Sequence, residues 1–322
     1  MAPSHLLSPL AVVLLAAVPA AGASASTPAV PQQGAVDTTT DQAPPTVGIE
    51  DYGPWEQLGA ATLSPRGEWM AYPISKNNDE DELRIRRLGR DSLITVPYGE
   101  NPSFSPDGRW LAYAIGLSEE RREKLREADE PVRSDLGLLD LRTGDTTVVP
   151  EVASFEFSDG GRFLAMRRYS ARDGAEGHRG ADLLLRDLAD GMDTNFGNVA
   201  SFEWEDDGAL LAMVVDAAEA AGNGVRVYDP RSGRLRTLDS RPAEYTGLAW
   251  RPSGDDLAVL RRRGDDDWSD STHVILAWRN LAGEEARALS FDPETATGFP
   301  DTLRIVEHRD LRWSDDGDRL FF

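Results

Sequence analysis

The segment that decides the fold is FSPDGRWLAY, residues 104–113. Pro106 presets φ at the first central position of a turn, and Asp107 suits the second position. Gly108 can then take the left-handed backbone conformation that closes a β-hairpin with a bulge. The nearly continuous apolar run after the turn predicts a strand that is buried on both faces.

This unit occurs six times in the chain. Its shared glycines are separated by 41, 53, 47, 46 and 63 residues, and periods of forty to fifty residues are typical of β-propeller blades. The six copies are LSPRGEWMAY at 63–72, FSPDGRWLAY at 104–113, FSDGGRFLAM at 157–166, WEDDGALLAM at 204–213, WRPSGDDLAV at 250–259 and WSDDGDRLFF at 313–322.

A second hairpin follows most repeats. The strand pattern of residues 136–141 precedes the turn RTGD, residues 142–145, and then the strand TTVV. Two hairpins make four antiparallel strands, which is one blade. The sequence therefore predicts an all-β fold, a β-propeller of four-stranded antiparallel blades, with five nearly complete blades and the start of a sixth.

Three further features complete the expected architecture. Each of the first five repeats has an alanine in its apolar strand, such as Ala112, which should allow neighbouring blades to approach closely. Residues 118–130, SEERREKLREADE, predict a short charged helix that ends before Pro131. Residues 291–310 form a longer interruption in the fifth repeat.

Charge excludes one class of partner. The 322 residues carry a formal net charge of −22, and residues 1–36 contain none of the charged residues. A field of this sign repels phosphate backbones, so we expect no nucleic-acid partner. The absence of cysteine excludes disulfides, thiolate nucleophiles and cysteine-ligated zinc.

The N-terminus has the pattern of a signal peptide. An apolar stretch at 6–21 is followed by small residues that fit a cleavage site near Ala25, so residues 1–25 are the predicted signal peptide. Residues 26–48 are rich in Ser, Thr, Pro and Gln and predict a disordered linker. Residues 49–322 are the predicted propeller domain. We expect a periplasmic or secreted protein with no membrane span after signal removal.

The sequence predicts no catalytic, cofactor-binding or metal-binding residue. It lacks the motifs of serine hydrolases, zinc peptidases and nucleotide-binding loops, and His178, His273 and His308 are each isolated. The acidic runs at 77–82, 265–267 and 315–316 lack the ligand spacing of a calcium loop. We interpret them as solvated loop tips.

The repeats resemble those of TolB-like propellers and of the N-terminal propellers of prolyl oligopeptidase-family (S9) serine peptidases. The resemblance covers about residues 55–322, and the opening WEQL at 55–58 and the closing LRWSDDGDRLFF at 311–322 look particularly like secreted bacterial members. In that family a propeller of seven or eight blades covers the mouth of a C-terminal α/β-hydrolase domain and admits short or unfolded peptides.

The resemblance implies a substrate-gating propeller whose partners are peptide substrates, through the channel, and the hydrolase domain of a longer parent chain. No catalytic residue transfers to this sequence, because the matching positions belong to the hydrolase domain. The chain is therefore expected to be an N-terminal fragment. A non-enzymatic TolB-like propeller that binds a periplasmic protein is the alternative, and a propeller enzyme such as a lactonase is a third class.

Overall fold

The repeat turns form β-hairpins in the computed structural model, which describes residues 48, 52–53, 55–170, 179–263, 272–283, 286–300 and 302–322. Each turn joins the first and second strands of a blade, and the two strands are antiparallel. The apolar segments after the second and fourth turns were predicted to be strands. They are β7 (Trp110–Ile115) and β14 (Leu211–Val215).

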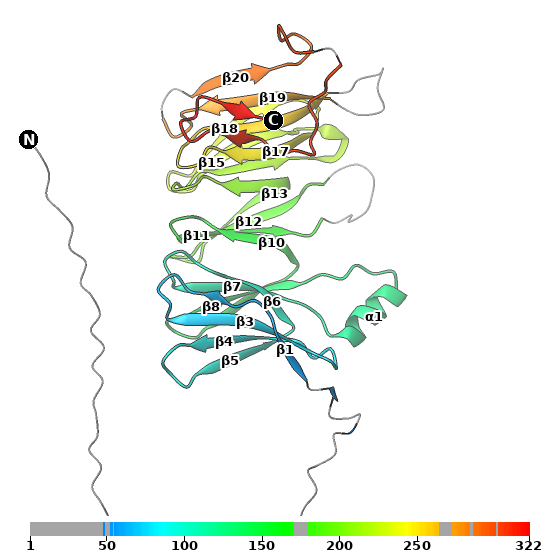
Figure 1. Ribbon diagram of the computed structural model, residues 1–322, viewed down its shortest axis with the longest axis vertical. Helices are drawn as coiled ribbons and strands as arrows, with labels where there is room; N and C mark the ends of the chain where they lie inside the picture. The colour runs from blue at the N-terminus through cyan, green and yellow to red at the C-terminus, as the bar shows by residue number, and fades with distance from the viewer. Residues whose placement is uncertain are drawn as a thin grey trace, which may run out of the picture. The chain divides into compact units, whose positions relative to one another are not determined.

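The strands follow one another as antiparallel meanders, which confirms the predicted fold class (Figure 1). In the first blade, β1 and β2 both pair with β3 and take the place of a single first strand. The two N-terminal blades contain β1 (Glu56–Leu58), β2 (Thr62–Leu63), β3 (Trp69–Lys76), β4 (Glu82–Arg87) and β5 (Leu93–Pro97), then β6 (Gly99–Phe104), β7, β8 (Asp135–Asp140) and β9 (Thr146–Val149).

The later blades repeat this order and end in the two-stranded start of a sixth blade. Their strands are β10 (Val152–Phe157), β11 (Phe163–Arg168), β12 (Ala181–Asp187) and β13 (Asp193–Trp204); then β14, β15 (Gly224–Asp229) and β16 (Arg234–Ser240); then β17 (Tyr245–Trp250), β18 (Leu257–Arg263), β19 (Thr272–Arg279) and β20 (Arg287–Phe291); and finally β21 (Arg312–Trp313) and β22 (Leu320–Phe321).

The third and fourth blades share one strand, which the repeat pattern did not predict. The N-terminal part of β13 pairs with β12, and its C-terminal part, from Val199, pairs with β14. The change of partner coincides with a shift in register between Val199 and Ser201 and a positive φ of 59° at Asn198. The two blades are therefore parts of one seven-stranded sheet.

The turn chemistry is visible at Ser105. Its hydroxyl oxygen accepts the backbone N–H of Trp110 at 2.9 Å and donates to Asp107 Oδ1 at 2.5 Å. Gly108 has φ = 71°, in the left-handed region that favours glycine. The predicted left-handed glycine is confirmed in four of the six repeats, namely Gly67, Gly108, Gly161 and Gly317.

The same prediction is wrong for Gly208 and Gly254. There the preceding residues take the positive φ, 58° at Asp207 and 53° at Ser253. The serine of the other turns is replaced by Glu205 and Arg251, whose longer side chains fold over the turn so that a Cβ on either glycine would collide with them. At these two positions a Cβ would require the Glu205 or Arg251 side chain to move, whereas the backbone conformation does not demand glycine.

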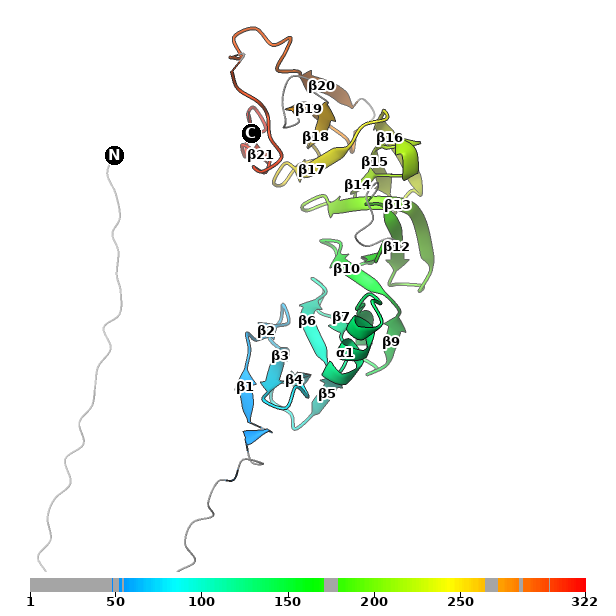
Figure 2. The ribbon, with the colours of Figure 1, turned by 90° about the vertical axis from the view of Figure 1, so that its right-hand side faces the viewer.

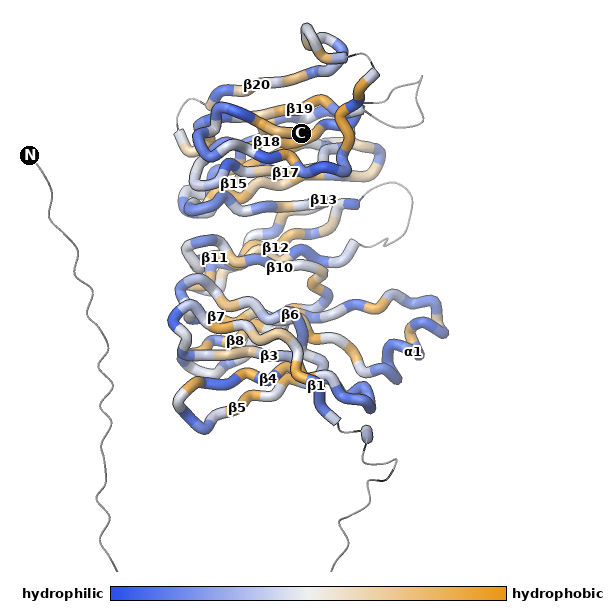
Figure 3. The backbone as a smooth tube through the Cα atoms, viewed as in Figure 1, coloured by the Kyte–Doolittle hydropathy of each residue, from blue (hydrophilic) through white to orange (hydrophobic). Residues whose placement is uncertain are grey.

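Alternate side chains of each second strand enter the apolar clusters on its two sides. In β11, Leu164 and Met166 pack with the second blade, whereas Phe163 and Ala165 pack with the fourth. Figure 3 shows the apolar residues along the strands and the polar residues at the turns. This double burial explains why the strand sequence is nearly continuous in apolar residues.

Each blade-to-blade cluster combines the repeat alanine of one blade with the repeat aromatic of the next. Ala212, which is fully buried, packs in the same cluster as Trp250. The other pairs are Ala71 with Phe104, Ala112 with Phe157, Ala165 with Trp204, and Ala258 with Trp313. The small side chain leaves the room that the large ring of the following blade occupies.

The tryptophans add a directed contact between blades. Trp204 Nε1 donates to the carbonyl of Glu156 at 3.3 Å, Trp250 Nε1 to that of Glu203 at 3.1 Å, and Trp313 Nε1 to that of Ala249 at 3.0 Å. Each acceptor immediately precedes the repeat aromatic of the earlier blade. The bond therefore sets the register of one first strand against the next.

The predicted helix is α1 (Glu119–Glu127), and the Ser118 hydroxyl accepts the N–H of Arg121 at its start. Among the described residues no helix is long and apolar enough to cross a membrane. The predicted signal peptide at 1–25, the linker up to residue 47, His178 and the acidic run at 265–267 lie outside the described residues.

Candidate functional site

The first strands of the blades form the surface on which a site can be built. In Figure 2, β2, β6, β10, β13, β17 and β21 lie along one side of the row of sheets, and the last strands lie on the other. From β10 to β21, successive first strands are connected by the tryptophan hydrogen bonds described above. Propellers have their blades around a central channel, and this row of first strands is the surface on which a site is sought here.

Two carboxyl groups occupy equivalent places on neighbouring first strands. The residue immediately before the repeat aromatic is Glu156 on β10 and Glu203 on β13. The corresponding residues of the other repeats are Thr62, Ser103, Ala249 and Arg312. At this position, therefore, two consecutive repeats carry acidic residues only in the third and fourth repeats.

Glu203 is the more perturbed of the two. Its Oε2 atom is buried and has no hydrogen-bond partner among the described residues. Desolvation, followed by the charges of Glu156, Asp206 and Asp310, raises the pKa of Glu203 from 4.5 to about 7. The pKa of Glu156 is also raised, first by desolvation and then by the charge of Asp206.

This arrangement favours the binding of a cationic ligand. Near pH 7 the Glu203 carboxyl exists in both protonation states, and a nearby ammonium or guanidinium group would favour the ionised state. Such a ligand would donate a hydrogen bond to Glu203 Oε2, which has no partner among the described residues. Its binding would release a proton in this pH range, because an ionised carboxylate replaces a protonated one.

A metal is not indicated by the described residues, because none of their His, Asp and Glu side chains form a group of three placed to hold an ion. His273 is buried, and its Nδ1 lies 2.9 Å from the carbonyl oxygen of Ile305, whereas His308 is exposed. The structure thus gives His273 a local contact.

The acidic runs in the described part have local partners. In the first run, Glu82 forms ion pairs with Lys76 and Arg84, at 2.7 and 2.6 Å. In the last run, Asp316 Oδ1 accepts the Ser314 hydroxyl at 2.6 Å. The Asp316 contact closes an exposed turn, which agrees with a loop tip, whereas Glu82 is a half-buried residue of strand β4 and is not a solvated loop tip.

The sequence analysis missed the pair formed by Glu156 and Glu203. Aligning the residue before each repeat aromatic gives Thr, Ser, Glu, Glu, Ala and Arg, so two consecutive acids were visible. The pattern gave no reason to single them out, because it contains no information on desolvation or on which first strands are neighbours.

Neither the family models nor the curated proteins match this chain. The solved structures that are similar to it include the β-propeller domain of the trilobed protease from Pyrococcus furiosus, with 15% identity and a TM-score of 0.42, covering 73% of this chain and 72% of that one. Another is the Pyrococcus horikoshii acylaminoacyl peptidase, with 13% identity and a TM-score of 0.41, covering 74% and 40% of the two chains.

A putative TolB from Agrobacterium tumefaciens is also similar, with 14% identity, a TM-score of 0.35 and coverage of 73% of this chain and 82% of that chain. The similar structures therefore include peptidases and a TolB protein, the two groups whose repeats this sequence resembles.

Proposed function

We propose that residues 49–322 are the substrate-gating propeller of a secreted prolyl oligopeptidase-like serine peptidase, with the catalytic α/β-hydrolase domain outside this chain. The repeat sequences, their propeller blades and the carboxyl pair on the first strands support this proposal. Fold alone does not establish an activity, so the proposal depends on what the inner surface can recognise.

The observation that carries the proposal is the unpartnered Oε2 atom of Glu203 next to Glu156. A peptide with a free N-terminus carries an ammonium group that can donate to this oxygen. A partly desolvated carboxylate binds such a group more strongly than an exposed one, because water screens it less. The gate would therefore prefer peptides with a free amine near the Glu203 position.

Peptide binding to this chain tests the gating role. We expect a short fluorescent peptide with a free N-terminus to bind more tightly than its N-acetylated form, and Glu203→Gln to remove most of that difference. Glu127→Gln, on the exposed face of α1, is the matched control. Equal binding of the free and acetylated peptides would refute the role of the carboxyl pair.

A second experiment tests the peptidase assignment and the location. The native gene product, isolated from its cells, should react with a fluorophosphonate probe, whereas residues 1–322 alone should not. Its mature N-terminus should lie near Ser24 or Ser26 if the signal peptide is cleaved. A native product that the probe does not label would favour the alternative, a TolB-like propeller that binds a protein partner.

A further inference from the structure

A cavity of about 310 Å³ lies beside the last hairpin of the fourth blade. A water molecule occupies about 30 Å³, so the cavity has room for about ten waters or for one small organic molecule. Its walls come from the turn before β14, from the β15–β16 hairpin and from the turn after β19. The charged residues that line it are Glu205, Asp229, Arg231, Arg234 and Arg236.

Two arginines of β16 give this cavity its cationic side. Arg234 and Arg236 are two positions apart on the strand, so their side chains leave it on the same face. Arg234 is exposed, whereas Arg236 is half-buried and its Nη2 donates to the carbonyl of Leu281. Among the described residues, neither guanidinium forms an ion pair with a carboxylate.

The carboxylate opposite Arg234 is bound to its own turn. Asp229 is the partner of Arg234 in the β15–β16 ladder, but its Oδ1 accepts a backbone N–H of the turn at 3.0 Å and its Oδ2 accepts the Ser232 hydroxyl at 2.7 Å. In the third blade, the corresponding ladder pair of Arg186 and Asp193 forms an ion pair at 2.7 Å. The fourth blade has the residues for such a pair and does not form it.

The two β16 arginines repel each other. Desolvation, followed by the charge of Arg234, lowers the pKa of Arg236, although the charges of Asp229 and Asp255 act in the opposite direction. The surroundings of Arg236 therefore disfavour its positive charge. An anion in the cavity would offset this effect, because it would attract both guanidinium groups.

The acidic lining residues already have partners in the protein. Glu205 Oε2 accepts the N–H groups of Ala209 and Leu210 at 3.2 and 3.1 Å. The third arginine, Arg231, lies close enough to Glu205 and Asp229 for its charge to act on both. A ligand would therefore meet the two β16 arginines as the charges that the described residues leave unmatched.

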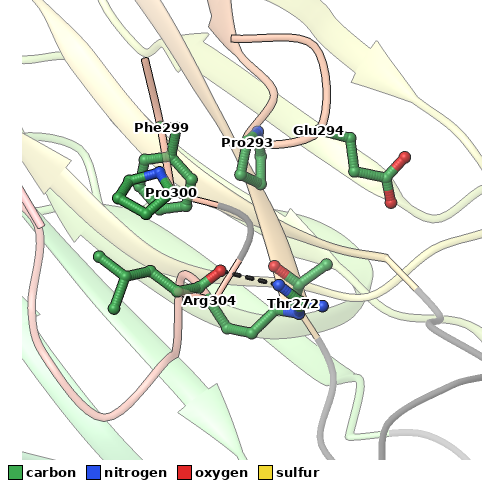
Figure 4. Close-up of a pocket in the computed structure, with 7 residues that line it drawn as sticks. Thr272, Pro293, Glu294, Phe299, Pro300 and Arg304 are labelled. Atoms are coloured by element: carbon green, nitrogen blue, oxygen red, sulfur yellow. Dashed lines mark hydrogen bonds between the residues drawn. The ribbon is translucent and has the colours of Figure 1, made fainter. Parts of the chain in front are cut away.

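The cavity at the start of β19 is different. Figure 4 shows Glu294 and Arg304 among its lining residues. Glu294 forms an ion pair with Arg263 at 2.5 Å, and Arg304 Nη1 donates to the carbonyl of Leu303 at 2.9 Å. Both charged groups of that cavity have partners within the protein.

We propose that the cavity beside β16 binds small phosphate monoesters. A phosphate monoester carries about 1.5 to 2 negative charges at pH 7, which matches two arginines, and its three terminal oxygens can accept from both planar guanidinium groups. A dicarboxylate spreads its charge over two separate groups, whereas Arg234 and Arg236 start from neighbouring positions of one strand. Leu210 and Leu281 line the same cavity and can contact the organic group of the ester.

The net charge of −22 does not prevent such binding. Salt screens exposed charges over distances of about 8 Å at physiological ionic strength, whereas the two arginines act on the phosphate at contact. The inference does not depend on the proposed peptidase function.

Calorimetric titration of residues 1–322 with phenyl phosphate tests the site. We expect binding to the unmodified chain, a loss of affinity of about tenfold or more in Arg234→Gln and in Arg236→Gln, and no binding of phenol. Arg90→Gln is the matched control, because it removes the same charge from an exposed residue in the turn between β4 and β5, and it should bind normally.

Thermal unfolding separates ligand binding from folding. Without ligand, Arg234→Gln should leave the unfolding midpoint unchanged or raise it, because it removes the repulsion of Arg236. Phenyl phosphate should raise the midpoint of the unmodified chain and of Arg90→Gln equally, and that of Arg234→Gln less.

Several outcomes would overturn the inference. A lack of phenyl phosphate binding to the unmodified chain would show that the arginines are already neutralised, for example by Glu284 or Glu285, which lie outside the described residues. Unchanged affinity in both cavity variants, an equal loss in Arg90→Gln, or equal binding of phenol would also overturn it. So would a lowered midpoint of Arg234→Gln without ligand, since the guanidinium would then have a partner.

Discussion

Replacing Glu203 by Gln should stabilise the folded chain at alkaline pH and have little effect on its stability at acidic pH. The folded chain raises the pKa of this carboxyl from 4.5 to about 7, so folding favours the protonated form. The corresponding stabilisation is fully present below pH 4.5 and is lost as the pH rises through about 7. Glutamine keeps the size of the side chain and cannot ionise.

The magnitude follows from the two pKa values. A pKa of about 7 against 4.5 corresponds to about 3 kcal/mol at 1.36 kcal/mol per pH unit. Part of the side chain contacts water, which lowers the effect, so we expect Glu203→Gln to be about 1–3 kcal/mol more stable than the unmodified chain above pH 8. Below pH 4.5 the two proteins should differ little.

Urea unfolding at both pH values, followed by far-ultraviolet circular dichroism, measures this difference. Comparing the variant with the unmodified chain at each pH cancels the titration of the other carboxyl groups. Glu127→Gln on α1 is the control and should show no such pH dependence. A Gln variant that is equally stable or less stable above pH 8 would show that Glu203 is not desolvated as the structure indicates.

Three further predictions concern the blade interfaces and the chain ends. Trp250→Phe should lower the free energy of unfolding by about 1–3 kcal/mol, because the partly buried Glu203 carbonyl loses its hydrogen bond from the indole N–H at 3.1 Å. Trp55→Phe changes a residue that is 52% exposed and should lower the free energy of unfolding little in the same urea titration. Ala212→Leu should cost about 1–3 kcal/mol by overpacking the cluster that holds Trp250, and an unchanged unfolding midpoint would contradict that packing. Purified residues 49–322 should bind hydrophobic dyes strongly, because large apolar side chains are exposed on the first blade and near the C-terminus. Leu63 is 57% exposed and Phe321 is 54% exposed. A monodisperse protein that does not bind the dye would contradict this prediction.

The blades themselves were predictable from the sequence. Turn residues such as Ser105 and Gly108 act through bonds within a few positions, so a short motif carries their whole signal. The spacing of the repeats and the apolar strands predicted the hairpins and the four-stranded sheets, and the charged run at 118–130 predicted the helix that is found at 119–127. The exceptions at Gly208 and Gly254 arose where Glu205 and Arg251 replaced the turn serine.

The relations between blades were decided only by the tertiary structure. The repeat pattern did not show that Ala212 makes room for Trp250, or that the indole donates to the carbonyl of Glu203, because these residues belong to different repeats. It also did not show that β13 serves two blades. The partners of a strand depend on packing over many residues, and local propensity contains little of that information.

The carboxyl pair shows most clearly which properties the sequence determined and which the tertiary structure decided. The sequence determined that acids stand before Phe157 and Trp204, and it determined the blades that carry them. Only the folded chain removed water from Glu203 and brought the charges of Glu156, Asp206 and Asp310 close enough to raise its pKa. Desolvation and Coulomb interaction depend on distance in space, so a property that arises from neighbours far apart in sequence appears only when the blades have packed.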